Sequence, residues 1–324
     1  MTREHSMSLP AQRPKRERNG RWLSRADRVL LALLVLLAAA GPFLGGYYLY
    51  VFTLAGIYAV ICLGNNLLLS HGGLVSIGQG ALCAIGAYAY GAAAQQGWPV
   101  PQCLLVSVLA STLSGAIVGL PALRLSGHYL ALVTLAFTIS VPEVIIVLDN
   151  VTGGASGMAI TTAIPPTANF YMMLAAVALI AVSQSQLIAS PFGIGLRLLR
   201  DSSRAAASVG IRGAKYKLIA FAYSGALAGF AGASFASATG YLTPGMFDVW
   251  LSIYVLAAVV LGGMRHPAGA VLGASIVAIV PQLVSQLQGL PSILFGSFLL
   301  LAILLRSLRG RRASGRLPGR RGHV

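Results

Sequence analysis

The sequence predicts an all-α, polytopic membrane protein with about ten spans and with both termini in the cytoplasm. Of its 324 residues, 56% are hydrophobic and only 9% are charged, whereas about a quarter of the residues of a soluble domain are charged. The apolar residues lie in long runs, and a helix needs roughly 20 of them to cross a bilayer with its backbone hydrogen bonds satisfied. The bilayer is therefore the main solvent of this chain.

Ten apolar runs make up a predicted transmembrane domain, residues 29–306, between two basic tails. The amino-terminal tail, residues 1–28, is polar and rich in arginine, so it buries too little apolar surface to fold alone and is expected to be disordered. Glycine and proline between residues 41 and 46 predict a tight hairpin of the first two spans. The predicted spans are 29–44, a second that begins at Tyr47, 77–95, 101–121, 128–148, 169–189, 217–240, 249–264, 268–288 and 291–306.

The basic residues indicate how these spans are oriented, because lysine and arginine near span ends stay on the cytoplasmic side. All 23 of them lie in the tail 1–28, at Arg124, in the loop 190–216 with Lys217, at Arg265 and from Arg306 onward, which includes the tail 307–324. Ten spans that start in the cytoplasm place all five segments inside. Losing one middle span puts a later basic loop outside, so the charge pattern favours ten. It leaves open whether the first span is cleaved.

The composition argues against several classes of function. The net charge of +16 lies in tails and loops rather than on a folded face, which disfavours nucleic-acid binding. Cys62, Cys83 and Cys103 lie in apolar runs without the spacing of a metal site, and we expect neither a metal nor another cofactor. No lysine follows a glycine, as a phosphate-binding P-loop requires. The chain is therefore not expected to be an enzyme, and any ATP hydrolysis must occur on another subunit.

Several short motifs follow one another in a characteristic order. They are Gly64-Asn65-Asn66-Leu67-Leu68-Leu69, the glycine-rich stretch from Gly72 to Ala81, the stretch from Leu120 to Ala131, Thr152-Gly153-Gly154-Ala155-Ser156-Gly157, Ser190-Pro191-Phe192-Gly193 and Leu261-Gly262-Gly263. Over roughly residues 47 to 290, their order and spacing resemble the LivM-type permeases of the branched-chain amino acid ABC transporters. Gln79 departs from the pattern, because the family often has histidine there.

The resemblance implies a permease subunit of an ATP-driven importer in the bacterial inner membrane. Its partners would be a paralogous second permease, two cytosolic ATP-binding subunits and a periplasmic substrate-binding protein. Branched-chain amino acids are the substrates expected first, and urea or short amides are the alternative. A proton-coupled secondary transporter is the alternative from another class. Such transporters usually pair buried ionisable groups along a relay, whereas this chain offers only Glu143 within a span.

The loop 190–216 is the predicted contact with the ATPase. Ala205-Ala206, three further residues and then Gly210 are similar to the short-helix motif by which importer permeases seat in a groove on their ATPase, with Arg204 where the general motif has glutamate. Small alanines allow a close approach, and glycine ends a helix in the left-handed conformation. An ordinary basic loop, retained by its charge, is the alternative.

Residues 70–80 are too polar and too rich in glycine for a continuous span. A broken helix exposes backbone dipoles that bind a substrate, so this stretch is either part of the translocation path or a turn that lets helices pack closely. The polar side chains considered for the path are Asn65, Asn66, Ser76, Gln79, Thr134, Thr138 and Glu143.

Other intramembrane features have simpler explanations as alternatives. An acidic residue in a span, such as Glu143, is a functional candidate by default. The alternative is that its carboxylate reaches the lipid headgroups, because Glu143 lies only one or two helical turns from Asp149 in the outer part of the span. The spacing of Gly225 and Gly229 predicts close helix packing. The arginine-rich tail 307–324 is expected to be drawn to anionic membrane lipid.

Overall fold

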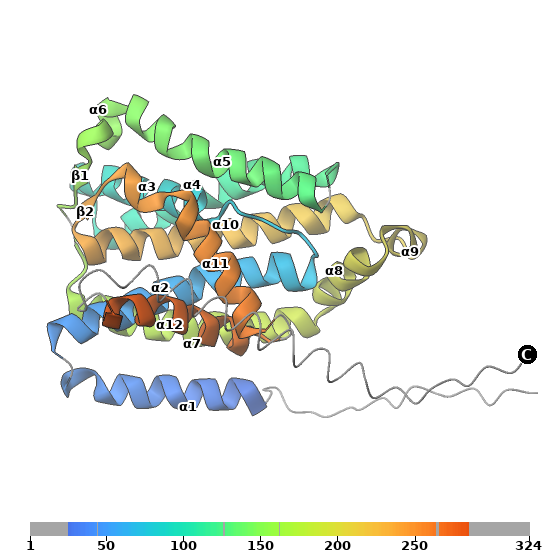
Figure 1. Ribbon diagram of the computed structural model, residues 1–324, viewed down its shortest axis with the longest axis horizontal. Coiled ribbons are helices and arrows are strands. Elements are labelled where there is room, and N and C mark those ends of the chain that lie inside the picture. Colours follow the sequence, from blue (N-terminus) through green and yellow to red (C-terminus); the bar gives the residue numbers. More distant parts are fainter. Residues whose placement is uncertain (1–24, 44, 126, 162, 264–265, 285–324) are drawn as a thin grey trace, which may run out of the picture.

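The computed structural model describes residues 25–284, except residues 44, 126, 162 and 264–265, and helices dominate these residues (Figure 1). In chain order the elements are α1 (Arg25–Ala40), η1 (Gly41–Phe43), α2 (Gly46–Asn66), η2 (Leu67–His71), α3 (Gln79–Gln95), α4 (Val100–Gly119), η3 (Pro121–Leu123), α5 (His128–Val147), α6 (Asp149–Thr152), η4 (Gly154–Ser156), β1 (Met158–Ala159), α7 (Pro166–Ala189), α8 (Pro191–Asp201), α9 (Ser203–Ser208), α10 (Gly213–Thr239), β2 (Tyr241–Leu242), η5 (Pro244–Phe247), α11 (Val249–Gly262) and α12 (Pro267–Val284).

Seven helical stretches of the described chain are long and apolar enough to cross a membrane. They are Ala26–Phe43, Gly46–His71, Val100–Gly119, His128–Val147, Pro166–Ala189, Gly213–Thr239 and Pro244–Gly262. One further apolar helix, Pro267–Gln282 within α12, is shorter, and α3 is a helix of 17 residues. An all-α polytopic membrane fold is thus confirmed, and each of the first nine predicted runs contains a helix within its described residues. The tenth run, 291–306, lies outside the described residues, as do residues 1–24 and the tail 307–324.

The start of α1 corrects one predicted boundary. Residues 25–28, assigned to a disordered tail, form the first turn of α1, which begins at Arg25. Asp27 lies in that turn, where a negative charge interacts favourably with the positive end of the helix dipole. Composition alone missed this turn because polar residues are common in the first turn of a helix that then enters an apolar run.

The helices differ greatly in how much of their surface the fold covers. In the apolar 18-residue stretch of α2 and η2, 83% of the residues are buried. The corresponding share is 22% for α1 and 22% for α7. α2, α3 and α10 therefore form the centre, and α1, α5 and α7 leave most of their apolar surface outward. Apolar side chains that face outward are stable in a bilayer because lipid tails solvate them.

Small residues bring α3, α4 and α10 into backbone contact. A Cβ atom added to Gly86 of α3 would stand 2.6 Å from the Cα of Gly229 on α10. Ser107 of α4 donates its hydroxyl to the carbonyl oxygens of both glycines, at 2.7 and 2.8 Å. Gly225 approaches the carbonyl oxygen of Ser111 just as closely. The packing role predicted from the spacing of Gly225 and Gly229 is confirmed.

The two ends of the molecule are built differently (Figure 1). α8 and α9 project at one end, whereas α6, η4 and the strands β1 and β2 lie at the other. The strands are antiparallel, with Met158 opposite Leu242 and Ala159 opposite Tyr241. They tie the loop that follows α5 to the loop that follows α10, and this two-stranded sheet is a small exception to the all-α prediction.

Candidate functional site

The chain leaves the helical conformation between α2 and α3, where the sequence predicts a break. α2 runs into η2, a turn of π-helix that ends at His71, and π turns are frequent at functional sites. Gly73 then has a φ of +64°, a left-handed conformation that glycine adopts without strain. Residues 72–78, here called the linking segment, carry the chain to the start of α3 at Gln79.

Hydroxyl groups of α5 hold the linking segment in place. The N–H of Ile77 donates to Thr134 Oγ1 at 2.9 Å, and Thr138 Oγ1 donates to the carbonyl oxygen of Ile77 at 2.6 Å. Inside a membrane such backbone groups must find partners within the protein, because hydrocarbon offers none. The two threonines replace the hydrogen bonds that a continuous helix would have made.

Serines of two further helices meet the first turn of α3. Gln79 Nε2 donates to Ser224 Oγ on α10 at 2.8 Å, and the N–H of Gly80 donates to Ser252 Oγ on α11 at 2.8 Å. A Cβ atom on Gly64 of α2 would stand 3.0 Å from Ser224 Oγ. Side chains of α5, α10 and α11 and the backbone of α2 therefore converge where α3 begins.

Several buried polar atoms near the end of α2 and the start of α3 have no hydrogen-bond partner in the described part of the chain. They are both side-chain polar atoms of Asn65, Nδ2 of Asn66 and Oε1 of Gln79. Asn65, Asn66 and Gln79 are fully buried, and an unsatisfied buried polar group costs about 1–3 kcal/mol. Such a concentration of unsatisfied donors and acceptors suits a site that a polar ligand or water completes.

Six of the seven side chains considered for the path, here together called the polar site, lie at the end of α2, in the linking segment, at the start of α3 or on the part of α5 that holds this segment. Asn65, Asn66, Ser76, Gln79, Thr134 and Thr138 are all buried. Glu143 is exposed on α5, and the structure does not bring it to the others. The sequence analysis missed Ser252, whose only signal is a hydroxyl in the otherwise apolar start of α11.

The loop 190–216 folds into α8, α9 and the start of α10. Ser202 caps α9 by accepting a hydrogen bond from the N–H of Ala205 at 3.2 Å. At the other end, Gly210 has a φ of +79°, and the N–H of Ile211 donates to the carbonyl oxygen of Ala206 at 3.0 Å. This is a Schellman-type end, for which glycine is the preferred residue. The predicted short helix with a glycine stop is present.

The residues of α9 differ in their exposure. Arg204 and Ala205 are exposed, and so is Gly210, whereas Ala206 is fully buried against the protein's own chain. α9 lies at the far end of the projection in Figure 1, away from the β1–β2 end. Arg204, Ala205 and Gly210 therefore lie on the outside of this projection, and Ala206 packs against the rest of the chain.

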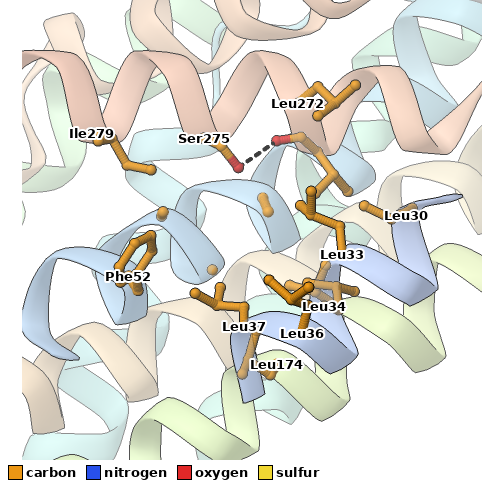
Figure 2. Close-up of a pocket in the computed structure, with 15 residues that line it drawn as sticks. Leu30, Leu33, Leu34, Leu36, Leu37, Phe52, Leu174, Leu272, Ser275 and Ile279 are labelled. Atoms are coloured by element: carbon orange, nitrogen blue, oxygen red, sulfur yellow. Dashed lines mark hydrogen bonds between the residues drawn. The ribbon is translucent and has the colours of Figure 1, made fainter. Parts of the chain in front are cut away.

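A cavity of about 310 Å³ lies away from this site, between α1, α2, α7 and α12 (Figure 2). Leucines of α1 face Phe52, Leu272 and Ile279 across it. Ser275 brings the one hydroxyl of the lining, and it already donates to the carbonyl oxygen of Val271 at 3.0 Å. The cavity offers nothing to a charged ammonium or carboxylate group, so it does not suit an amino acid.

Comparison with known proteins decides the family. A family profile described as "Branched-chain amino acid transport system / permease component" matches residues 47–308. The chain belongs to this permease family. The resemblance seen in the order of the sequence motifs is thus confirmed, and the linking segment, the polar site and α9 all lie within the matched range.

Two individual members of the permease family are similar over most of the chain, and a third is similar over about a third of it. The "High-affinity branched-chain amino acid transport system permease protein LivM" of Escherichia coli (strain K12) is 30% identical over 316 residues, covering 86% of this chain and 74% of that protein. Its counterpart in Salmonella typhimurium gives the same values. A "Probable branched-chain amino acid transport permease protein LivH" of Methanocaldococcus jannaschii is 31% identical over 121 residues, 36% of this chain and 38% of that protein.

The comparison with solved structures found no match. Family membership and the seven membrane-length helices of the described chain both indicate a membrane protein. The permease is a multi-pass protein of a bacterial inner membrane.

Proposed function

We propose that this permease is the membrane subunit of an ATP-driven importer and that it translocates branched-chain amino acids. The observation that carries the proposal is the similarity to LivM over 86% of the chain. Because no glycine precedes any of the three lysines, ATP hydrolysis is assigned to separate subunits. The expected partners are a second, related permease, two cytosolic ATP-binding subunits and a periplasmic substrate-binding protein.

The proposed topology has ten spans and both tails, 1–24 and 307–324, in the cytoplasm. Basic residues support it, because Arg200 in the last turn of α8 and Lys217 near the start of α10 flank α9 along the chain, and Lys217 Nζ donates to the carbonyl oxygen of Ala122 at 2.9 Å. A cysteine at Ser208 should then react with a membrane-impermeant thiol reagent only in permeabilised cells, and one at Ser156 in intact cells. Cys62, Cys83 and Cys103 are buried, so their background labelling is expected to be low.

The proposed translocation path runs past the linking segment. Its support is the set of unpartnered buried polar atoms on Asn65, Asn66 and Gln79, together with the backbone exposed by the broken helix. An amino acid's ammonium group would bind the acceptor oxygens there, and its carboxylate would bind the amide donors. Glu143 is left out of this path because it is exposed on another face.

The proposed ATPase contact is the exposed side of α9 with Arg204, Ala205 and Gly210. An Ala205→Glu variant would place a charged side chain on that surface without disturbing the buried Ala206. Uptake should fall by about tenfold or more, as the loss of one well-packed contact of at least 1.4 kcal/mol implies. A Ser156→Glu variant at the opposite end is the control. Normal uptake and normal ATPase binding by Ala205→Glu would contradict the assignment.

Reconstitution tests the function as a whole. The permease, its second permease and both ATP-binding subunits are purified together, placed in liposomes and supplied with the loaded binding protein. Uptake of labelled leucine should require ATP and the binding protein, and excess urea should not compete with it. Uptake by the lone chain that follows the proton gradient would favour the secondary transporter instead.

A further inference from the structure

One arginine of the cytoplasmic projection contacts the linking segment. Arg200, in the last turn of α8, donates a hydrogen bond from Nη1 to the carbonyl oxygen of Ser70 at 2.5 Å. A Cβ atom on Gly73 would stand 2.5 Å from the Cγ of the same arginine. The side chain of Arg200 thus touches the chain on both sides of the bend that begins the linking segment.

The bond to Ser70 satisfies a group that the local fold leaves open. Ser70 lies in the last turn of η2, where carbonyl groups lack partners within the helix. A guanidinium donor makes a shorter and stronger hydrogen bond than a neutral one. The hydroxyl of Ser70 in turn donates to Asn66 Oδ1 at 2.5 Å. Arg200 is therefore two hydrogen bonds away from a buried amide of the polar site.

Apolar packing reinforces the same connection. Leu196, one turn before Arg200 on α8, is buried in a cluster with Leu68 and Leu74, the residues that flank the bend. A Cβ atom on Gly72 would stand 3.1 Å from Leu196 Cδ2. Closely packed interiors transmit displacement rather than absorb it. A shift of α8 therefore has to move the bend or break these contacts.

The neighbouring arginine of α8 makes no hydrogen bond to the bend among the described residues, although its charge acts on His71 in η2. Arg197 donates to the carbonyl oxygens of Ile188, at 2.6 Å, and Gly193, at 3.4 Å, which lie at the end of α7 and in α8 itself. Its bonds stay within the α7–α8 corner. Arg200 also pairs with Asp201 at 3.1 Å, but both side chains are exposed and such pairs contribute little. The contact with Ser70 is what distinguishes Arg200.

We propose that Arg200 is a positioning residue that couples movement of α8 and α9 to the linking segment, and so to the polar site. The inference rests on the proposed function, in which ATPases pull on α9. Gly73 supplies a pivot, because its left-handed backbone lies next to the arginine stem. Displacement of the projection would pull the Ser70 carbonyl and rearrange residues 72–78, which alters the polar site during each ATP cycle.

The test compares Arg200→Met with Arg197→Met in the assembled transporter. Both variants lose a guanidinium and keep a long apolar stem. Arg200→Met should bind its ATPases and hydrolyse ATP at close to the normal rate, while leucine transported per ATP falls about tenfold, the change expected when a hydrogen bond to a charged group is lost. Arg197→Met should keep both rates. Arg200→Lys should restore part of the loss, because an ammonium group also donates to a carbonyl.

A second measurement follows the linking segment itself. A cysteine at the partly exposed Val75 should change its reactivity toward a small thiol reagent between the nucleotide-free and vanadate-trapped complex. The change should disappear in Arg200→Met and persist in Arg197→Met. An unchanged transport-to-ATP ratio in Arg200→Met, or an equal loss of transport and hydrolysis, would overturn the proposal.

A third variant covers the case in which Arg200→Met does not assemble. Gly73→Ala disturbs the same contact from the other partner, and Gly97→Ala is its control, since Gly97 has a φ of +76° with nothing near its Cβ position. Gly73→Ala should lower transport per ATP and Gly97→Ala should not, whereas equal ratios would overturn the coupling. Failure of the proposed function is recognised separately, because the wild-type complex would then show no ATP-dependent uptake.

Discussion

Two glycine-rich regions at the centre of the permease use the same residue in different ways. Between α3 and α10, Gly86 and Gly229 lie in the middle of helices and let two backbones touch. In the linking segment, Gly72 and Gly73 let the chain leave a helix. One region is a packing seam and the other is a break, although both read as glycine-rich stretches of a membrane protein.

The polar groups near the two regions differ in whether their hydrogen bonds are satisfied. At the seam, the hydroxyl of Ser107 donates to Gly86 and Gly229, and that of Ser111 donates to Leu82 at 2.9 Å. At the break, the buried amides of Asn65 and Gln79 keep atoms without a partner among the described residues. Satisfied groups favour one fixed arrangement, whereas unsatisfied ones have something to gain from a ligand. The seam is therefore a packing contact that supports the fold, whereas the break is the place where we propose that the substrate passes.

The seam should be the more sensitive of the two to added volume. In Gly229→Val, the new side chain would meet the Ser107 carbonyl oxygen and the Ser111 side chain, both 2.7 Å from the Cβ position. We expect a cost at or above the upper end of the about 1–3 kcal/mol typical of overpacking, because backbone atoms cannot rotate away. The yield of monodisperse protein in detergent and its thermal midpoint measure the effect.

Gly245→Val is the control for this variant, since no atom of the described residues lies within 4 Å of its Cβ position. It should leave yield and thermal midpoint unchanged. If Gly229→Val is as stable as this control, the packing between α3, α4 and α10 accommodates a larger side chain. The proposed difference between the seam and the break would then be wrong.

The break should lose function rather than stability. Replacing both Thr134 and Thr138 by valine keeps their shape but removes the two hydroxyls that hold Ile77. Each lost bond costs about 0.5–1.5 kcal/mol or more once a backbone group is left unsatisfied, so uptake should fall about tenfold at near-normal protein level. The measurement is leucine uptake per unit of transporter, alongside quantification of the folded complex.

Thr112→Val provides the matched control, because among the described residues the Thr112 hydroxyl bonds only to Val108 of its own helix, at 2.6 Å. Its uptake should equal that of the wild type. If uptake falls equally in both variants, the hydroxyls of Thr134 and Thr138 have no specific role in holding the linking segment.

Local features of both regions could be predicted from sequence. The spacing of Gly225 and Gly229 indicated packing, the composition of residues 70–80 indicated a break, and Gly210 indicated the end of α9. Each depends on the conformation or close approach that glycine permits, which is a property of a short stretch. The nine described apolar helices followed in the same way from run length.

The contacts that close the site could not be predicted. The bond from Gly80 to Ser252 joins residues 172 positions apart, and that from Arg200 to Ser70 joins residues 130 positions apart. Nothing in one sequence pairs such residues, because their meeting depends on the packing of all the helices between them. The face that Glu143 presents was unpredictable for the same reason.

Replacing Glu143 should have the smallest effect on transport, because Glu143 lies beyond the part of α5 that contacts the linking segment. It lies on α5 as Thr138 does, but five residues further on, roughly 140° around the helix axis at 3.6 residues per turn. Thr138 faces the break and is fully buried, whereas Glu143 is exposed. We expect Glu143→Gln to transport at the wild-type rate in both mildly acidic and neutral medium, with the Thr134 and Thr138 double variant as the impaired reference. A loss that depends on pH would instead assign the carboxylate to a proton or substrate path and extend the site along α5 beyond the break.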